Sequence, residues 1–167
     1  MPLYLVQHGQ SLSKDVDPAQ GLSEEGVAGT ERIAGVAKNY RINVGQIMHS
    51  IKTRARKTAD IFASALNPTG GVTEVEGLKP MDDVAAFAAS LNPDTNTMLV
   101  GHLPFMERMT SYLVTGSSDK PVFKFQNSGI VCLDKDPDSE SWVIVWTLMP
   151  NVGYHPLLTN NQSAAAD

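Results

Sequence analysis

Short apolar runs alternate with amphipathic segments along the first two thirds of the chain. The apolar runs of strand length are 3–6, 46–49, 72–75 and 97–100. Apolar residues recur at helical spacing between and after these runs, which predicts helices over 23–40, 54–66, 82–91 and 105–114. Strands that alternate with helices in this way predict a parallel sheet covered by helices on both faces.

Two of the predicted helices begin with residues that favour a helix N-terminus. Ser23 can cap free backbone N–H groups, and the carboxylates of Glu24 and Glu25 behind it suit the positive end of the helix dipole. After Pro80, either Asp82 or Asp83 can cap the third helix in the same way.

The final third of the chain has a different pattern. The runs predicted as strands there are 122–125, 130–133 and 142–148, the last two separated by a turn-rich segment. We expect them to form an antiparallel edge of the same sheet, which gives a three-layer α/β/α fold in a single domain over 1–159. Residues 160–167 are small and polar, so they are expected to be a disordered tail.

Composition narrows the class of protein further. The chain has 167 residues, 42% of them apolar, and a formal net charge of −5 with scattered basic residues, which argues against a nucleic-acid partner. No apolar run approaches the ~20 residues that cross a bilayer, and the apolar N-terminus is too short for a signal peptide. Cys132 is the single cysteine, which excludes an internal disulfide. We therefore expect a cytoplasmic protein with no membrane association.

Candidate chemistry gathers where the predicted strands end. Ligands of open α/β sheets bind beyond the carboxyl ends of the strands, and His8 and His102 directly follow the first and fourth predicted strands. Arg54 opens the helix that follows the second strand, where a helix N-terminus already favours an anion. Two imidazoles and a guanidinium in one crevice suit a tetrahedral oxyanion such as a phosphoryl group.

Four sequence motifs resemble those of a known family. They are Leu-Val-Gln-His-Gly-Gln-Ser at 5–11, Leu-Ser-Glu-Glu-Gly at 22–26, Arg-Ala-Arg-Lys-Thr-Ala at 54–59 and Leu-Val-Gly-His-Leu-Pro at 99–104. Their order and spacing resemble the histidine phosphatase superfamily, whose fold is phosphoglycerate mutase-like. The His-Leu-Pro ending and the late strand pair are similar to its SixA-type phosphohistidine phosphatases.

The resemblance implies a set of roles for individual residues. His8 would attack phosphorus and become transiently phosphorylated, while Arg54 and His102 would bind the phosphoryl oxygens. Gln7 and Ser11 would add phosphate contacts, and no metal or cofactor is implied. A nucleophilic imidazole also needs a partner that fixes its tautomer, and a backbone carbonyl near Gly9 is the nearest one. The implied partner is a protein that carries phosphohistidine, or a small phosphorylated substrate; the oligomeric state is open.

Gln7 stands where the family carries arginine. Glutamine offers a neutral amide in place of a permanent charge and a bidentate fork. Losing one preorganised donor from a transition-state site typically costs about a hundred- to a thousandfold in rate. Lys52 and Arg56 are the neighbouring cations available to restore the charge. The alternative function is therefore a family member that binds a phosphorylated partner or phosphate ligand without turning it over.

The general acid stays open at this point. One branch of the family places an aspartate directly after the second histidine, where this chain has Leu103. Asp82, Asp83 and Glu76 lie in the region where another branch places its acid. A phosphohistidine substrate relaxes the requirement, because imidazole leaves more readily than an alkoxide. A mutase-like enzyme ranks behind, since the chain lacks the insertions that enclose a small substrate.

The two other histidines carry no chemistry in this interpretation. His49 and His155 are expected to be structural or merely exposed. The four histidines show none of the close paired spacings of structural zinc motifs, so we expect no metal site.

Overall fold

The computed structural model describes residues 1–151. Its strands are β1 (Leu3–Gln7), β2 (Gln46–His49), β3 (Val72–Glu74), β4 (Thr97–Gly101), β5 (Ile130–Lys135) and β6 (Trp142–Leu148). Its helices are α1 (Glu24–Asn39), α2 (Thr53–Leu66), α3 (Val84–Ser90) and α4 (Phe105–Thr115). Residues 152–159 of the predicted domain, the predicted tail over 160–167 and His155 lie outside the described residues.

The six strands form one mixed sheet in the order β3-β2-β4-β1-β5-β6. The first four strands in that order are parallel, and β5 and β6 add an antiparallel edge. The predicted fold class is therefore confirmed. The parallel register places the carboxyl ends of β1, β2 and β4 side by side, because Gln7 lies opposite Gly101 and His49 opposite Val100.

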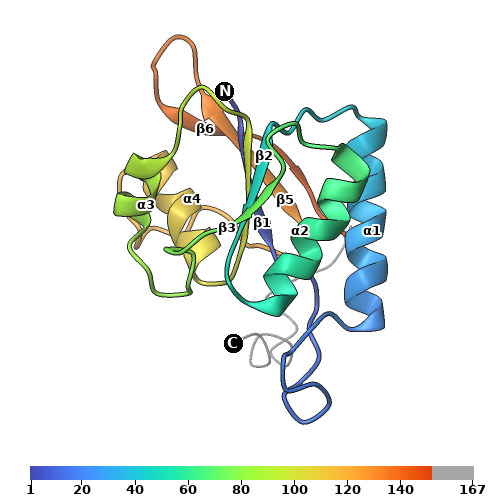
Figure 1. Cartoon of the computed structure of the whole chain (residues 1–167). Helices are drawn as coiled ribbons and strands as arrows, with labels where there is room; N and C mark the ends of the chain where they lie inside the picture. The colour runs from blue at the N-terminus through green and yellow to red at the C-terminus, as the bar shows by residue number, and fades with distance from the viewer. Residues whose placement is uncertain (152–167) are drawn as a thin grey trace.

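The helices cover both faces of the sheet (Figure 1). Helices α1 and α2 lie together on one face, and α3 and α4 on the other. Side chains of β1 alternate between the two apolar cores, with Tyr4 and Val6 toward α1 and α2 and with Leu3 and Leu5 toward α4. Among residues 1–151, no helix combines the length and the apolar character needed to span a bilayer.

The helix starts follow the predicted capping chemistry. The Ser23 hydroxyl accepts a hydrogen bond from the Gly26 N–H at 3.0 Å, and of the two candidate aspartates it is Asp83 that caps α3. Gly26 lies so close to the backbone of Gln10 that a Cβ atom would collide with the Gln10 carbonyl. This contact anchors the loop after β1 on the first turn of α1.

The prediction of a strand over 122–125 is wrong. This segment pairs with no strand in the described part of the chain. It packs beside α4, with Phe125 buried in the apolar core and Phe123 edge-to-face against it at 5.5 Å. Glu107 of α4 fastens the segment, because its carboxylate pairs with Lys124 at 3.1 Å and accepts the Phe125 N–H. Its apolar residues thus cover a helix instead of extending the sheet.

Candidate active site

The two histidines that follow β1 and β4 lie next to each other, with tilted rings, at the carboxyl end of the sheet. The ring centroids of His8 and His102 are 5.0 Å apart with an interplanar angle of 57°. Both side chains are buried, and the backbone N–H of His8 donates to the Gly101 carbonyl at 3.0 Å. The neighbouring strand ends therefore bring together two imidazoles that are 94 positions apart in sequence (102 − 8).

Contacts at both ring nitrogens define the tautomer of His8. Its Nδ1 lies 2.7 Å from the Gly9 carbonyl oxygen, which can only accept a hydrogen bond, so Nδ1 carries the proton. Its Nε2 accepts a hydrogen bond from Arg54 Nε at 3.2 Å, so Nε2 carries a lone pair. The two contacts agree on one neutral tautomer, and the carbonyl partner expected near Gly9 is Gly9 itself.

Arg54 reaches His8 from the first turn of α2. The side chain is 2% exposed. The first turn of α2 carries no acidic residue, so no carboxylate in that turn offsets the positive end of the helix dipole. Lys52, the residue before the helix, makes no side-chain cap. The guanidinium and the helix N-terminus together make this end of the sheet suited to an anion.

His102 is held as a neutral imidazole. Its Nε2 lies 2.8 Å from the Ser50 hydroxyl oxygen, and the ring is fully buried. Burial lowers the pKa of His102 to about 3, and electrostatic interactions with His8, Arg54 and Lys52 lower it further. At neutral pH this side chain can therefore offer a hydrogen bond but no charge.

Three residues that support the histidines escaped the sequence analysis. The Thr58 hydroxyl accepts the Gly9 N–H at 2.9 Å and donates to the Arg54 carbonyl at 2.8 Å, which joins the loop of His8 to α2. Asn127 Nδ2 donates to the His8 carbonyl at 2.8 Å, and Ser50 contacts His102. Thr58 lies inside the motif at 54–59 and Ser50 directly follows the strand predicted over 46–49, which were usable signals; Asn127 had none.

Gln7 is buried at the end of β1 and brings no charge to the crevice. Its side chain is 4% exposed, and its Oε1 has no hydrogen-bond partner among the residues that the structure describes. The backbone carbonyl of Gln7, by contrast, accepts the Ser128 N–H at 2.9 Å. The departure from arginine noted in the sequence thus leaves a neutral amide beside His8.

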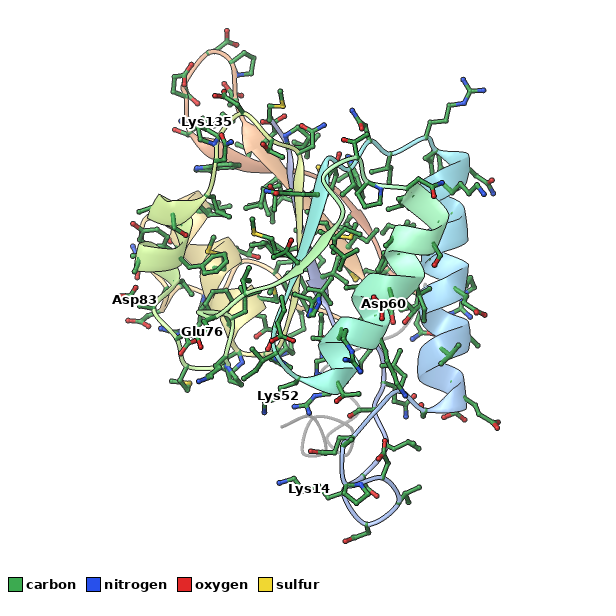
Figure 2. All side chains as sticks on the ribbon, in the orientation of Figure 1. Lys14, Lys52, Asp60, Glu76, Asp83 and Lys135 are labelled. Atoms are coloured by element: carbon green, nitrogen blue, oxygen red, sulfur yellow. The ribbon has the colours of Figure 1, made fainter. Side chains whose placement is uncertain are left out.

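The other predicted site residues lie in two places. Ser11 is half-buried in the loop after β1, where it forms an isolated bridge with Leu22. Glu76, Asp82 and Asp83 instead line a surface hollow of about 410 Å³ beside α3, and Figure 2 shows Glu76 and Asp83 on that side of the molecule.

The aspartates of this hollow already have backbone partners. The Asp82 carboxylate accepts the Lys79 N–H at 2.9 Å, and that of Asp83 accepts the Ala85 and Ala86 N–H groups at 2.9 and 3.2 Å. The lining of the hollow includes neither His8 nor His102.

The structure also shows the positions of the remaining candidates, Lys52, Arg56 and His49. Lys52 is half-buried just below the first turn of α2 (Figure 2), whereas Arg56 is exposed. His49 is buried, with its Nδ1 2.8 Å from the Ser50 carbonyl oxygen. Within residues 1–151, no three His, Cys, Asp or Glu side chains are grouped so that they could hold a metal ion.

Comparison with known proteins places this fold. No family model matches the chain. An uncharacterized protein of Picosynechococcus sp. is 29% identical over 142 residues, which cover 80% of this chain and 84% of that protein. The structure of the protein histidine phosphatase SixA complexed with tungstate has a TM-score of 0.77 at 24% identity, over 90% of this chain and 97% of that chain. A candidate phosphohistidine phosphatase SixA from Agrobacterium tumefaciens has a TM-score of 0.71 at 24% identity, over 89% and 97%.

The fold is therefore that of the histidine phosphatases. Within that class the similar structures include SixA proteins, which the sequence motifs indicated. The same fold also occurs in a mycobacterial glucosyl-3-phosphoglycerate phosphatase, with a TM-score of 0.64 at 19% identity over 87% of this chain and 98% of that chain. The fold alone thus accommodates more than one kind of phosphorylated substrate.

Proposed function

We propose that this protein is a phosphatase that acts through a phosphorylated His8, needs no metal, and takes phosphohistidine on a protein as its substrate. The observation that carries the proposal is the fixed tautomer of His8. A nucleophilic imidazole needs a lone pair on its attacking nitrogen, and the Gly9 carbonyl keeps the proton on Nδ1 so that the lone pair stays on Nε2.

Arg54 and His102 supply the donors that a phosphoryl group needs. Arg54 holds the Nε2 lone pair of His8 with one of its five N–H groups. When a phosphoryl group enters, the guanidinium turns its donors to the phosphoryl oxygens and releases that lone pair. The neutral imidazole of His102 adds a hydrogen bond from the opposite side without adding charge.

Phosphoryl transfer to His8 balances without a general acid when the substrate is protonated phosphohistidine. His8 Nε2 forms a bond to phosphorus while the phosphorus–nitrogen bond of the substrate breaks. The bonding pair stays on the departing ring nitrogen, and because the other ring nitrogen already carries a proton, the leaving group is neutral imidazole. This suits a site whose candidate acids, Asp82 and Asp83, line a separate hollow and already accept hydrogen bonds from their own turns.

A water molecule then hydrolyses the phosphorylated His8. It attacks phosphorus, the bond to His8 Nε2 breaks, and the electron pair returns to Nε2 while Nδ1 keeps its proton on the Gly9 carbonyl. Both protons of the water leave with dihydrogen phosphate. The tungstate in the similar SixA structure supports a tetrahedral oxyanion as the ligand of this fold.

The test is turnover of 1-phosphoimidazole and of 4-nitrophenyl phosphate with a chelator present, comparing the natural protein with His8→Ala. We expect His8→Ala to lower the rate by at least about a thousandfold, because the covalent route is lost. His49→Ala is the matched control, since it truncates a second buried histidine that contacts a neighbouring carbonyl. Rapid quenching should trap phosphate on the natural protein in an acid-labile bond.

Two other outcomes would redirect the proposal. Activity that survives His8→Ala would remove His8 as the nucleophile. Tungstate binding without any turnover would favour the alternative, a member that binds phosphorylated partners and leaves them intact.

A further inference from the structure

The side-chain amide of Gln7 takes no part in the steps above, although Gln7 is buried and directly precedes His8. Gln7 precedes His8 and is paired in the parallel register with Gly101, which precedes His102. Gln7 thus lies level with Gly101, one residue before each of the two histidines, and its side chain is 96% buried, the complement of its 4% exposure. Its Oε1 lacks a hydrogen-bond partner among the described residues.

An unpartnered carbonyl oxygen disfavours the binding of a phosphate oxygen beside it. Phosphoryl oxygens are hydrogen-bond acceptors, and so is Gln7 Oε1, so the two repel each other. Arginine at this position would present donors only, whereas glutamine presents a donor and an acceptor whichever way the amide is turned. A buried acceptor of this kind needs an N–H or O–H group that arrives with the ligand.

We propose that Gln7 is a specificity-determining residue, whose side-chain carbonyl accepts the ring N–H of a protonated phosphoimidazole leaving group and so selects phosphorus–nitrogen substrates over phosphate esters. This inference rests on the proposed function and identifies Gln7 as the residue that recognises the leaving group. The N–H belongs to the ring nitrogen that is not bonded to phosphorus.

The chemistry of the leaving group explains why this contact assists the reaction. Protonation of the second ring nitrogen lets the imidazole depart neutral, so a fixed acceptor for that proton stabilises the reactive form of the substrate. An aryl or alkyl phosphate has no N–H at the equivalent place, and its leaving oxygen would meet the carbonyl of Gln7 acceptor to acceptor. The proton stays on the imidazole, and Gln7 is unchanged over the cycle.

The first measurement is the ratio of kcat/KM for 1-phosphoimidazole to that for 4-nitrophenyl phosphate. Gln7→Met, which keeps the length of the chain but carries neither donor nor acceptor, should lower this ratio by about ten- to a hundredfold, the worth of a hydrogen bond to a charged group. Gln7→Arg should lower it as well, by raising the ester rate. Gln10→Met is the control, because Gln10 is an exposed glutamine three residues further along the same loop.

The second measurement does not depend on turnover. A pyrazole phosphonate carries a ring N–H and a carbon–phosphorus bond that cannot be hydrolysed, and phenylphosphonate lacks the N–H. Calorimetry should show tighter binding of the pyrazole compound by the natural protein, and loss of that preference in Gln7→Met and Gln7→Arg.

The outcomes separate this inference from the proposed function. If Gln7→Met and Gln7→Arg leave both the kinetic ratio and the binding preference unchanged while His8-dependent turnover continues, the inference is wrong and the function stands. If no substrate is turned over but the pyrazole preference depends on Gln7, the function is wrong and the recognition stands. Should Gln7→Met fail to fold, Gln7→Arg carries both measurements.

Discussion

The two histidines of the crevice occupy equivalent positions after neighbouring parallel strands, yet the protein holds them in different ways. Both ring nitrogens of His8 have defined contacts, with the Gly9 carbonyl and Arg54, and its backbone is bound by Asn127. The Nε2 atom of His102 lies 2.8 Å from the Ser50 hydroxyl, and burial beside cations keeps this imidazole neutral. The contacts of His8 define its tautomer, and the burial of His102 defines its charge.

This difference matches a division of labour. A nucleophile needs its lone pair aimed and its proton held elsewhere, which the contacts of His8 provide. A residue that stabilises developing charge needs a donor that costs no reorganisation, which a desolvated neutral imidazole provides. The same residue type therefore supplies two functions, and the surroundings decide which.

Substitution of Thr58 removes a hydrogen bond that holds the loop carrying His8. Thr58→Val keeps the shape of the side chain but leaves the buried Gly9 N–H without its acceptor. An unsatisfied buried donor costs about 1–3 kcal/mol, so the free energy of unfolding should fall by that amount and turnover should fall with it. Urea denaturation and the rate with 1-phosphoimidazole measure the two effects.

Thr110→Val is the matched control for this prediction. Thr110 is also fully buried in a helix and also donates to a carbonyl four residues earlier, but its hydroxyl accepts no hydrogen bond from another loop within residues 1–151. Its loss should cost less than that of Thr58 and leave the rate unchanged. Equal effects of the two substitutions would show that the link to Gly9 contributes nothing.

The difference between His8 and His102 was only partly predictable from sequence. Local patterns place both histidines at strand ends, because apolar runs of strand length end directly before them and parallel strands share one carboxyl edge. The contacts that distinguish them come from residues far away in the chain, such as Asn127, which is 119 positions from His8. No periodicity reports a contact of that kind.

The same limit explains the segment at 122–125. Phe123 and Phe125 alternate with the exposed residues Val122 and Lys124, as in a strand, but the two rings pack against α4 and against each other. Alternation shows that one side of a segment is buried; it does not show whether a sheet or a helix buries it. Helix starts were predictable because the caps at Ser23 and Asp83 are contacts within one turn.

The charge of His102 gives a prediction on pH. Its pKa of about 3 lies below the ordinary 6.5, so the unfolded chain takes up a proton near pH 6.5 that the folded protein does not bind until about pH 3. The free energy of unfolding therefore falls as pH decreases through that interval, by up to about 1.4 kcal/mol per unit. Between pH 6 and pH 5 we expect the natural protein to lose about 1 kcal/mol more than His102→Gln.

Urea denaturation of both proteins at the two pH values measures this difference. The carboxylates of the chain titrate alike in both, so their contribution cancels in the comparison. Parallel losses in the two proteins would mean that His102 binds its proton equally well in the folded and unfolded states.

The smallest expected effect concerns the charge that Gln7 does not supply. The positive charge of Lys52 acts on His102, and its side chain is half-buried at the start of α2, whereas Arg56 is exposed one turn later. Lys52→Gln should therefore weaken tungstate binding by about two- to fivefold, the range of a partly screened charge interaction, and added salt should shrink the difference. Arg56→Gln removes the same single charge from a formal net charge of −5, so it controls for the overall electrostatics and should leave the affinity unchanged. Calorimetric titration at low and high salt tests both variants, and equal weakening by the two would assign the effect to net charge instead of to the position of Lys52.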